Sequence, residues 1–141
     1  MANDAGDFAR SMSIATSGLR AQAGRMRVIS ENIANADSTA PTVGGEPYRR
    51  KVPTFSSALD RSLDARTVTL GKVRIDRSDF RVKHEPGNPA ADANGHVKYP
   101  NVNPLIEMTD MREAQRSYEA NLNIISATRR MIQRTLDILK A

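Results

Sequence analysis

Histidine and carboxylate side chains are the first candidates for chemistry in this sequence. His84 and His96 are its two histidines, and Glu85 and Asp92 lie near them along the chain. Imidazole and carboxylate groups bind zinc, so a metal site in this segment is conceivable. The histidines lie twelve residues apart, however, without the i, i+4 spacing of a helical metal pair. We therefore interpret them as exposed loop residues and expect no metal site.

Motifs for catalysis or cofactor binding are missing. The chain has no cysteine, which excludes thiolate ligands, disulfides and cysteine nucleophiles. It has no G-x-S-x-G sequence, and Gly71-Lys72 lacks the upstream glycine and the following hydroxyl residue of a phosphate-binding loop. We expect no catalytic residues, no cofactor and no enzymatic activity.

The positive charge of the chain needs a separate explanation. Its 21 Lys and Arg residues outnumber 16 Asp and Glu, and the densest clusters are Arg49-Arg50-Lys51 and Arg129-Arg130. Neither cluster alternates with aromatic residues, so we expect a mixed, solvated surface and no nucleic-acid partner. A basic helical module that binds an acidic partner, with Arg134 contributing, is kept as an alternative.

Four asparagines lie inside or near the ends of segments that otherwise favour helix. They are Asn32, Asn35, Asn121 and Asn123. Asparagine is a weak helix former, but its amide both donates and accepts hydrogen bonds, so a buried copy can define how two helices align. The alternative is a solvent-facing side chain that a long helix tolerates, and physical reasoning alone slightly favours it.

Two long amphipathic helices are predicted, one at each end of the chain. The first covers Asp7 to Asn35 and ends before Pro41, and the second covers Asn103 to Lys140, with Asn103 as N-cap and Pro104 in the first turn. Both carry residues at alternating spacings of three and four, which places them on one helix face. In the first helix these are Met12, Ala15, Leu19, Gln22, Met26, Ile29, Ile33 and Ala36. In the second they are Met111, Gln115, Tyr118, Leu122, Ile125, Arg129, Ile132, Leu136 and Leu139, beside a second line of Ile124, Met131 and Ile138.

The central segment has a different character, because it holds six of the seven prolines and no helical period. Residues 68–70 and 73–75 alternate as short strands around Gly71, residues 80–83 form a third candidate, and residues 85–89 favour a turn. We expect a mainly α chain, with its terminal helices packed as a coiled coil and an extended centre containing a small β-hairpin. The predicted divisions are residues 1–39, 40–102 and 103–141.

The sequence is compatible with two uses of the predicted helices. Only 39% of the residues are hydrophobic and 4% aromatic, which is little for a single compact core and points weakly toward contacts between chains. The helices could bury their stripes on each other, or leave an apolar face for other subunits. No apolar run is long enough to span a membrane, and Met1 to Phe8 lacks the pattern of a cleaved secretory signal, so we expect no membrane insertion.

The same terminal segments carry a family resemblance. Ser17–Gln22 (SGLRAQ) followed by Ser30–Thr39 (SENIANADST) resembles the N-terminal signature of the flagellar rod, hook and hook-associated axial proteins. Glu107–Asn121 (EMTDMREAQRSYEAN) resembles the matching C-terminal signature. Pro89–Asn103 and the short centre resemble the proximal rod subunits of that family, and the likeness covers nearly the whole chain.

The resemblance implies a structural subunit of the proximal rod in the flagellar basal body, part of the drive shaft that carries motor torque to the hook. Its implied partners are copies of itself, the rod proteins FlgB, FlgF and FlgG, the adaptor FliE with the MS-ring, and the flagellar type III export apparatus. The implied location is the periplasmic rod, reached without a cleaved signal. The alternatives are another axial subunit, of the FlgB or distal-rod type, and the basic binding module.

Residue roles also follow from the resemblance. Phe55 and Leu59 fit the aromatic-to-apolar spacing by which such substrates are recognised at the export gate. The residues expected at subunit interfaces are Leu19, Met26, Ile29, Asn32, Ile33, Asn35, Met111, Tyr118, Asn121, Leu122, Ile125, Ile132, Leu136 and Leu139.

Overall fold

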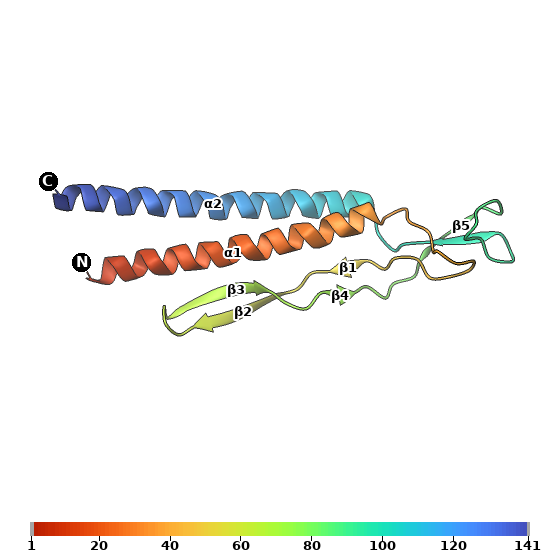
Figure 1. Cartoon of the computed structure of the whole chain (residues 1–141), viewed down its shortest axis with the longest axis horizontal. Helices are drawn as coiled ribbons and strands as arrows, with labels where there is room; N and C mark the ends of the chain where they lie inside the picture. Colours follow the sequence, from red (N-terminus) through yellow and green to blue (C-terminus); the bar gives the residue numbers. More distant parts are fainter. Residues whose placement is uncertain (1, 141) are drawn as a thin grey trace. The chain divides into compact units, whose positions relative to one another are not determined.

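A computed structural model describes residues 2–140 of the chain, and side-chain environments from residue 6 onward. Two long helices enclose a central β region in the sequence: α1 spans Ala2–Ala34 and α2 spans Pro104–Lys140 (Figure 1). The mainly α fold with a β centre is thus confirmed. Three of the four helix ends lie within one residue of their predicted positions, whereas α1 begins at Ala2 and not at Asp7. None of the helices within residues 2–140 is long and apolar enough to cross a membrane.

Polar side chains define the C-terminal end of α1 and the N-terminal end of α2, the two helix ends that flank the central segment. The Asn103 side chain accepts a hydrogen bond from the Leu105 amide at 3.1 Å, so Asn103 is the N-cap of α2 as predicted. At the end of α1, the Asn35 side-chain amide donates to the Glu31 carbonyl at 2.8 Å, and the Ser38 hydroxyl donates to the Asn35 carbonyl at 2.9 Å. The same two carbonyl groups also accept the backbone amides of Asn35 and Ser38, at 3.2 Å each, so side chain and backbone together close the end of α1.

The centre forms three separate two-stranded antiparallel sheets. β1 (Lys51–Val52) pairs with β4 (Arg74–Ile75), β2 (Phe55–Asp60) with β3 (Ala65–Leu70), and β5 (Arg81–His84) with β6 (His96–Tyr99). The strands predicted at residues 68–70, 73–75 and 80–83 correspond to β3, β4 and β5, but β3 and β4 do not pair with each other across Gly71. The hairpin turns instead at residues 61–64, where Asp64 has a φ of 46°, and Gly71 continues the ladder by donating to the Thr54 carbonyl at 2.6 Å.

Contacts within the chain define two units. The first contains the chain up to Met26, Thr54–Lys72, and the part of α2 from Glu113 onward. In it, α1 contacts α2 on one side: a Cβ added at Gly18 would lie 2.9 Å from Oδ1 of Asn121. On another side α1 contacts β3, because the Ser17 hydroxyl accepts a hydrogen bond from the Val68 amide at 3.2 Å. Figure 1 shows β2 and β3 as one hairpin.

The second unit contains Arg27–Pro53 and Val73–Arg112. Its small apolar core lies beneath the β5–β6 hairpin, where Ala90, Val97 and Tyr99 pack together. β6 alternates between exposed and buried residues, with Val97 and Tyr99 facing inward and His96 and Lys98 facing solvent. The predicted turn at residues 85–89 lies within the connection between β5 and β6. The ends of α1 and α2 in this unit meet at polar residues, which form the candidate site.

The burial pattern of α2 differs in phase from the predicted stripe. Its innermost residues follow a spacing of seven: Glu107, Ala114 and Thr128 are buried, and Asn121 is half-buried. Met111, Tyr118, Ile125 and Ile132 flank this line and are half-buried, whereas the alternate members Gln115, Leu122, Arg129 and Leu136 are exposed. The inner face is therefore made of small and polar residues, and much of the apolar stripe faces outward.

Candidate functional site: a buried polar network

Asn32 of α1 is the centre of a polar network in the second unit. Its side chain is 0% exposed and uses its full hydrogen-bonding capacity. Nδ2 donates to the Lys51 carbonyl at 2.8 Å and to Oε2 of Glu107 at 3.0 Å. Oδ1 accepts from the Lys51 amide at 2.9 Å and from the Tyr48 hydroxyl at 2.8 Å. One amide thus joins α1 to α2, to β1 and to the segment before β1.

Glu107 extends the network from the first turn of α2. The residue is 1% exposed, and Oε1 accepts a hydrogen bond from Nε of Arg50 at 2.6 Å while Oε2 accepts from Asn32. A buried carboxylate is costly unless it is paired and hydrogen-bonded, and here both oxygens have a partner. Glu107 and Arg50 therefore depend on each other for their place in the structure.

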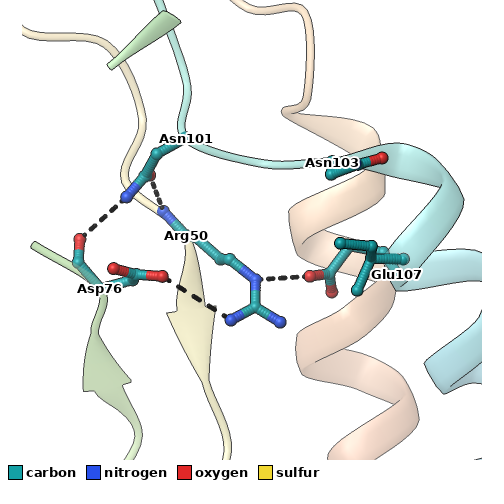
Figure 2. Close-up of a pocket in the computed structure, with 6 residues that line it drawn as sticks. Arg50, Asp76, Asn101, Asn103 and Glu107 are labelled. Atoms are coloured by element: carbon teal, nitrogen blue, oxygen red, sulfur yellow. Dashed lines mark hydrogen bonds and ion pairs between the residues drawn. The ribbon is translucent and has the colours of Figure 1, made fainter. Parts of the chain in front are cut away.

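Arg50 connects this carboxylate to the β4 side of the unit. Figure 2 shows its side chain extending between Asp76 and Glu107. Its Nη1 lies 3.7 Å from Oδ2 of Asp76, and its Nη2 lies 3.8 Å from Oδ2 of Asp110. Its backbone amide donates to Oδ1 of Asn101 at 2.8 Å, and Nδ2 of Asn101 donates to the Asp76 carbonyl at 3.1 Å. An open pocket lies beside Arg50, and Asn103 and Ile106 also line it.

Electrostatics in the network follow from burial and charge. Removal from water, and then the carboxylates of Glu31 and Glu107, raise the pKa of the Tyr48 phenol to about 12. Hydrogen bonds from the backbone and side chain of Ser78, more than the nearby Arg50, lower the pKa of Asp76. Tyr48 is therefore a neutral donor and Asp76 an ionised acceptor over a wide pH range. Lys51 forms an ion pair with Glu31 at the edge of the network.

The structure separates the predicted interface residues by exposure. Ile29 and Asn32 are buried inside the subunit. Leu122, Leu136 and Leu139 are 42%, 45% and 62% exposed, and both members of the export-gate pair are exposed on β2. Half-buried positions are Leu19, Met26, Ile33, Asn35, Met111, Tyr118, Asn121, Ile125 and Ile132. Whether these residues meet neighbouring subunits remains a prediction.

Sequence reasoning missed much of the network. Arg50 was assigned to a solvated cluster, but its side chain is 23% exposed and pairs with a buried carboxylate. Tyr48 and Glu107 were not singled out at all. The sequence held no clear signal for Glu107, because the line with spacing seven that it begins on α2 is defined by burial in the structure. Asn32, for which solvent exposure was slightly favoured, is buried, and that preference was wrong.

Comparisons with known proteins identify the class to which this architecture belongs. A family model described as "Flagella basal body rod protein" matches residues 12–40, and one described as "Flagellar basal body rod FlgEFG protein C-terminal" matches residues 93–138. Both are models of flagellar rod proteins. Together they include the ends of α1 and α2 that hold Asn32 and Glu107.

Individual relatives narrow the assignment. A flagellar basal-body rod protein FlgC of Agrobacterium fabrum is 57% identical over 91% of this chain and 92% of its own length. The FlgC proteins of Bacillus subtilis and Salmonella typhimurium are 41% and 40% identical, over 92% and 89% of this chain and 97% and 92% of their own lengths. The chain belongs to the FlgC family of flagellar basal-body rod proteins. It is a structural rod subunit of the basal body, not an enzyme, as the family resemblance implied.

Proposed function

We propose that the two terminal helices of this subunit pack on each other as a coiled coil. Their outward faces then pack on neighbouring subunits, so that the subunit polymerises in the proximal rod. The observation that carries the proposal is the exposure of large apolar residues along α2. Ile124, Met131 and Ile138 form an exposed line with spacing seven, and Leu122 and Leu136 form a second. Exposed apolar surface of this extent favours association, because burying it stabilises a complex.

The two exposed lines flank the inner line of α2. At 3.6 residues per turn, Leu122 lies about 100° from Asn121 in one direction and Ile124 about 60° in the other. A helix with one inner and two outer faces has room for neighbours on two sides. Contacts in more than one direction are what a helical polymer requires, because each subunit must bind others both along and around the assembly.

The remaining parts of the proposal follow from membership of the family. The assembled rod acts as the drive shaft that transmits motor torque to the hook. FlgB, FlgF, FlgG, FliE and the MS-ring are the neighbours at its ends, and the flagellar type III apparatus delivers the subunit across the membrane to the periplasm. Phe55 and Leu59 on β2 are the candidate export-gate residues, and their exposed side chains agree with recognition by another protein.

Leu122→Asp combined with Met131→Asp tests the proposal, since it places a charge on each exposed line without touching the inner face. The variants are expressed in Agrobacterium fabrum lacking its own FlgC, after the unaltered chain has been shown to restore swimming. We expect the double variant to be exported but to leave cells non-motile and without rods in purified basal bodies. Asn123→Asp, an exposed neighbour between the two lines, is the matched control and should swim normally.

Normal swimming of the double variant would exclude these faces as subunit interfaces. Loss of the protein from the cell would be distinguished by immunoblotting, and a folding defect by circular dichroism of the purified chain. Variants that fail at either step are replaced by Leu122→Gln with Met131→Gln, which remove apolar contact without adding charge.

A further inference from the structure

The β5–β6 hairpin brings together the two histidines of the chain. His84 of β5 and His96 of β6 are direct cross-strand partners in an antiparallel register. Their ring centroids lie 5.2 Å apart, with the ring planes inclined by 63°. Both side chains face solvent, because β6 turns Val97 and Tyr99 inward and His96 outward. The sequence separation of twelve residues concealed this pairing, since strand register, and not helical spacing, brings the rings together.

We propose that His84 and His96 bind one first-row divalent transition-metal ion, of the class of Zn²⁺, Ni²⁺ or Cu²⁺. Imidazole nitrogen is a good ligand for these ions. With metal–nitrogen bonds of about 2.1 Å, two imidazoles on one tetrahedral ion have ring centroids about 5 Å apart. The rings of His84 and His96 already have this separation, so the strand register places both imidazoles within reach of one ion.

The surrounding hairpin holds the two strands in place for this role. The Glu85 amide donates to the Gly95 carbonyl at 2.8 Å, and the Asp92 amide donates to the His96 carbonyl at 2.9 Å. Gly95 has a φ of +76°, and a Cβ at this position would lie 3.0 Å from Cε1 of His84. The turn is thus shaped to leave room for the His84 ring. A preorganised pair loses little conformational freedom on binding, which favours affinity.

Asp92 supplies a carboxylate beside the His96 ring. Its Oδ1 lies 3.9 Å from Nδ1 of His96 and accepts hydrogen bonds from the amides of Asn94 and His96, each at 2.9 Å. A carboxylate beside one imidazole nitrogen orients the ring so that the other nitrogen is presented to a metal. Within residues 2–140 no group of three or more His, Cys, Asp or Glu side chains could hold a metal, so each chain contributes two ligands and water completes the coordination.

Isothermal titration calorimetry of the purified chain with ZnCl₂ and with NiCl₂ tests the site. We expect one ion per chain with a dissociation constant in the micromolar range. His84→Ala or His96→Ala should each weaken binding by roughly tenfold or more, because a single imidazole cannot chelate. Lys98→Ala, on the same exposed face of β6, should leave the affinity unchanged.

A register variant makes the test specific. His84→Val combined with Val82→His keeps two histidines on the same face but places one opposite Lys98 instead of His96. It should bind at least about tenfold more weakly than the original chain. Pulsed electron paramagnetic resonance of the Cu²⁺ form should detect two equivalent imidazoles in the original chain and one in either alanine variant. Absence of binding, or binding that survives loss of one histidine undiminished, would overturn the proposal.

Discussion

Asn32 and Lys51 are joined by a reciprocal pair of hydrogen bonds. The side-chain amide of Asn32 pairs with the backbone of Lys51 in the way that the backbone of a neighbouring strand would. Nδ2 donates to the Lys51 carbonyl and Oδ1 accepts from the Lys51 amide. A helix has no free backbone groups with which to pair a strand, so this side chain supplies them. β1 is therefore held at one register on α1.

Removing this amide should be strongly destabilising. Asn32→Ala leaves the backbone of Lys51 and the Tyr48 hydroxyl without partners in a buried site, and we expect a loss of about 2–4 kcal/mol in the free energy of unfolding. Urea denaturation followed by circular dichroism measures it. Asn123→Ala, at an exposed position of α2, is the control and should change stability by less than about 0.5 kcal/mol. If the two substitutions lowered the free energy of unfolding equally, the hydrogen bonds of Asn32 would not be a specific source of stability.

The Arg50–Glu107 pair predicts a non-additive result. Glu107→Ala alone leaves Arg50 partly buried without its main partner, and Arg50→Ala alone leaves a buried carboxylate, so each should cost about 3–5 kcal/mol. The double variant Arg50→Ala with Glu107→Ala should be less destabilised than the two single losses combined, since neither member of the pair is left without its partner. Chemical denaturation of all three variants decides it, and simple additivity would argue against direct coupling.

Close packing of the helices predicts a steric effect at Gly18. A Cβ there would lie within 3.1 Å of three atoms of the Asn121 amide, which is held by its own hydrogen bond to the Ser117 carbonyl. Gly18→Ala should therefore destabilise the subunit by about 1–3 kcal/mol, and Asn121→Ala should relieve the clash. Gly6→Ala, where no heavy atom lies within 4 Å, should instead stabilise α1 slightly. Thermal unfolding of the three variants provides the comparison.

Tyr48 predicts the behaviour of the network in alkali. Its pKa is about 12 in the folded chain against an ordinary value of 10.0. Because the folded pKa is the higher one, the associated stability is complete below pH 10 and is lost as the pH rises toward about 12. Ultraviolet titration of a variant with Tyr99→Phe and Tyr118→Phe isolates the Tyr48 phenol. A midpoint near pH 10 in the folded protein would contradict the buried environment.

The helices were predictable because their signals are local. Asn103 and Pro104 mark the start of α2, and alternating spacings of three and four indicate amphipathic helices wherever they occur. The phase of burial was harder, because Leu122 and Leu136 appear as core residues to any rule that buries apolar side chains. The actual inner line contains Glu107 and Thr128, and Glu107 is tolerated there because both of its carboxylate oxygens accept hydrogen bonds.

The β pairings could not be read from the sequence for a related reason. Val68–Leu70 has the alternation of a strand, but alternation does not say which strand is its partner. Its partner, residues 55–60 (FSSALD), lacks the alternation of apolar and polar residues that predicts a strand. The network around Asn32 depends on contacts across the fold, such as the one to Glu107, 75 residues away.

That separation has a consequence for the order in which the subunit folds. The Ser56–Thr69 contact in the β2–β3 hairpin spans 13 residues, and short loops of this kind close quickly. The Asn32–Glu107 bond cannot form until the N-terminal and C-terminal helices have come together, which is the slower, non-local event. We expect the hairpins to form early and the hydrogen bond from the Asn32 side chain to Glu107 to form late. A chain that has not yet docked its final helix therefore keeps an unpaired donor at Asn32, and folding is complete only when that donor is bound.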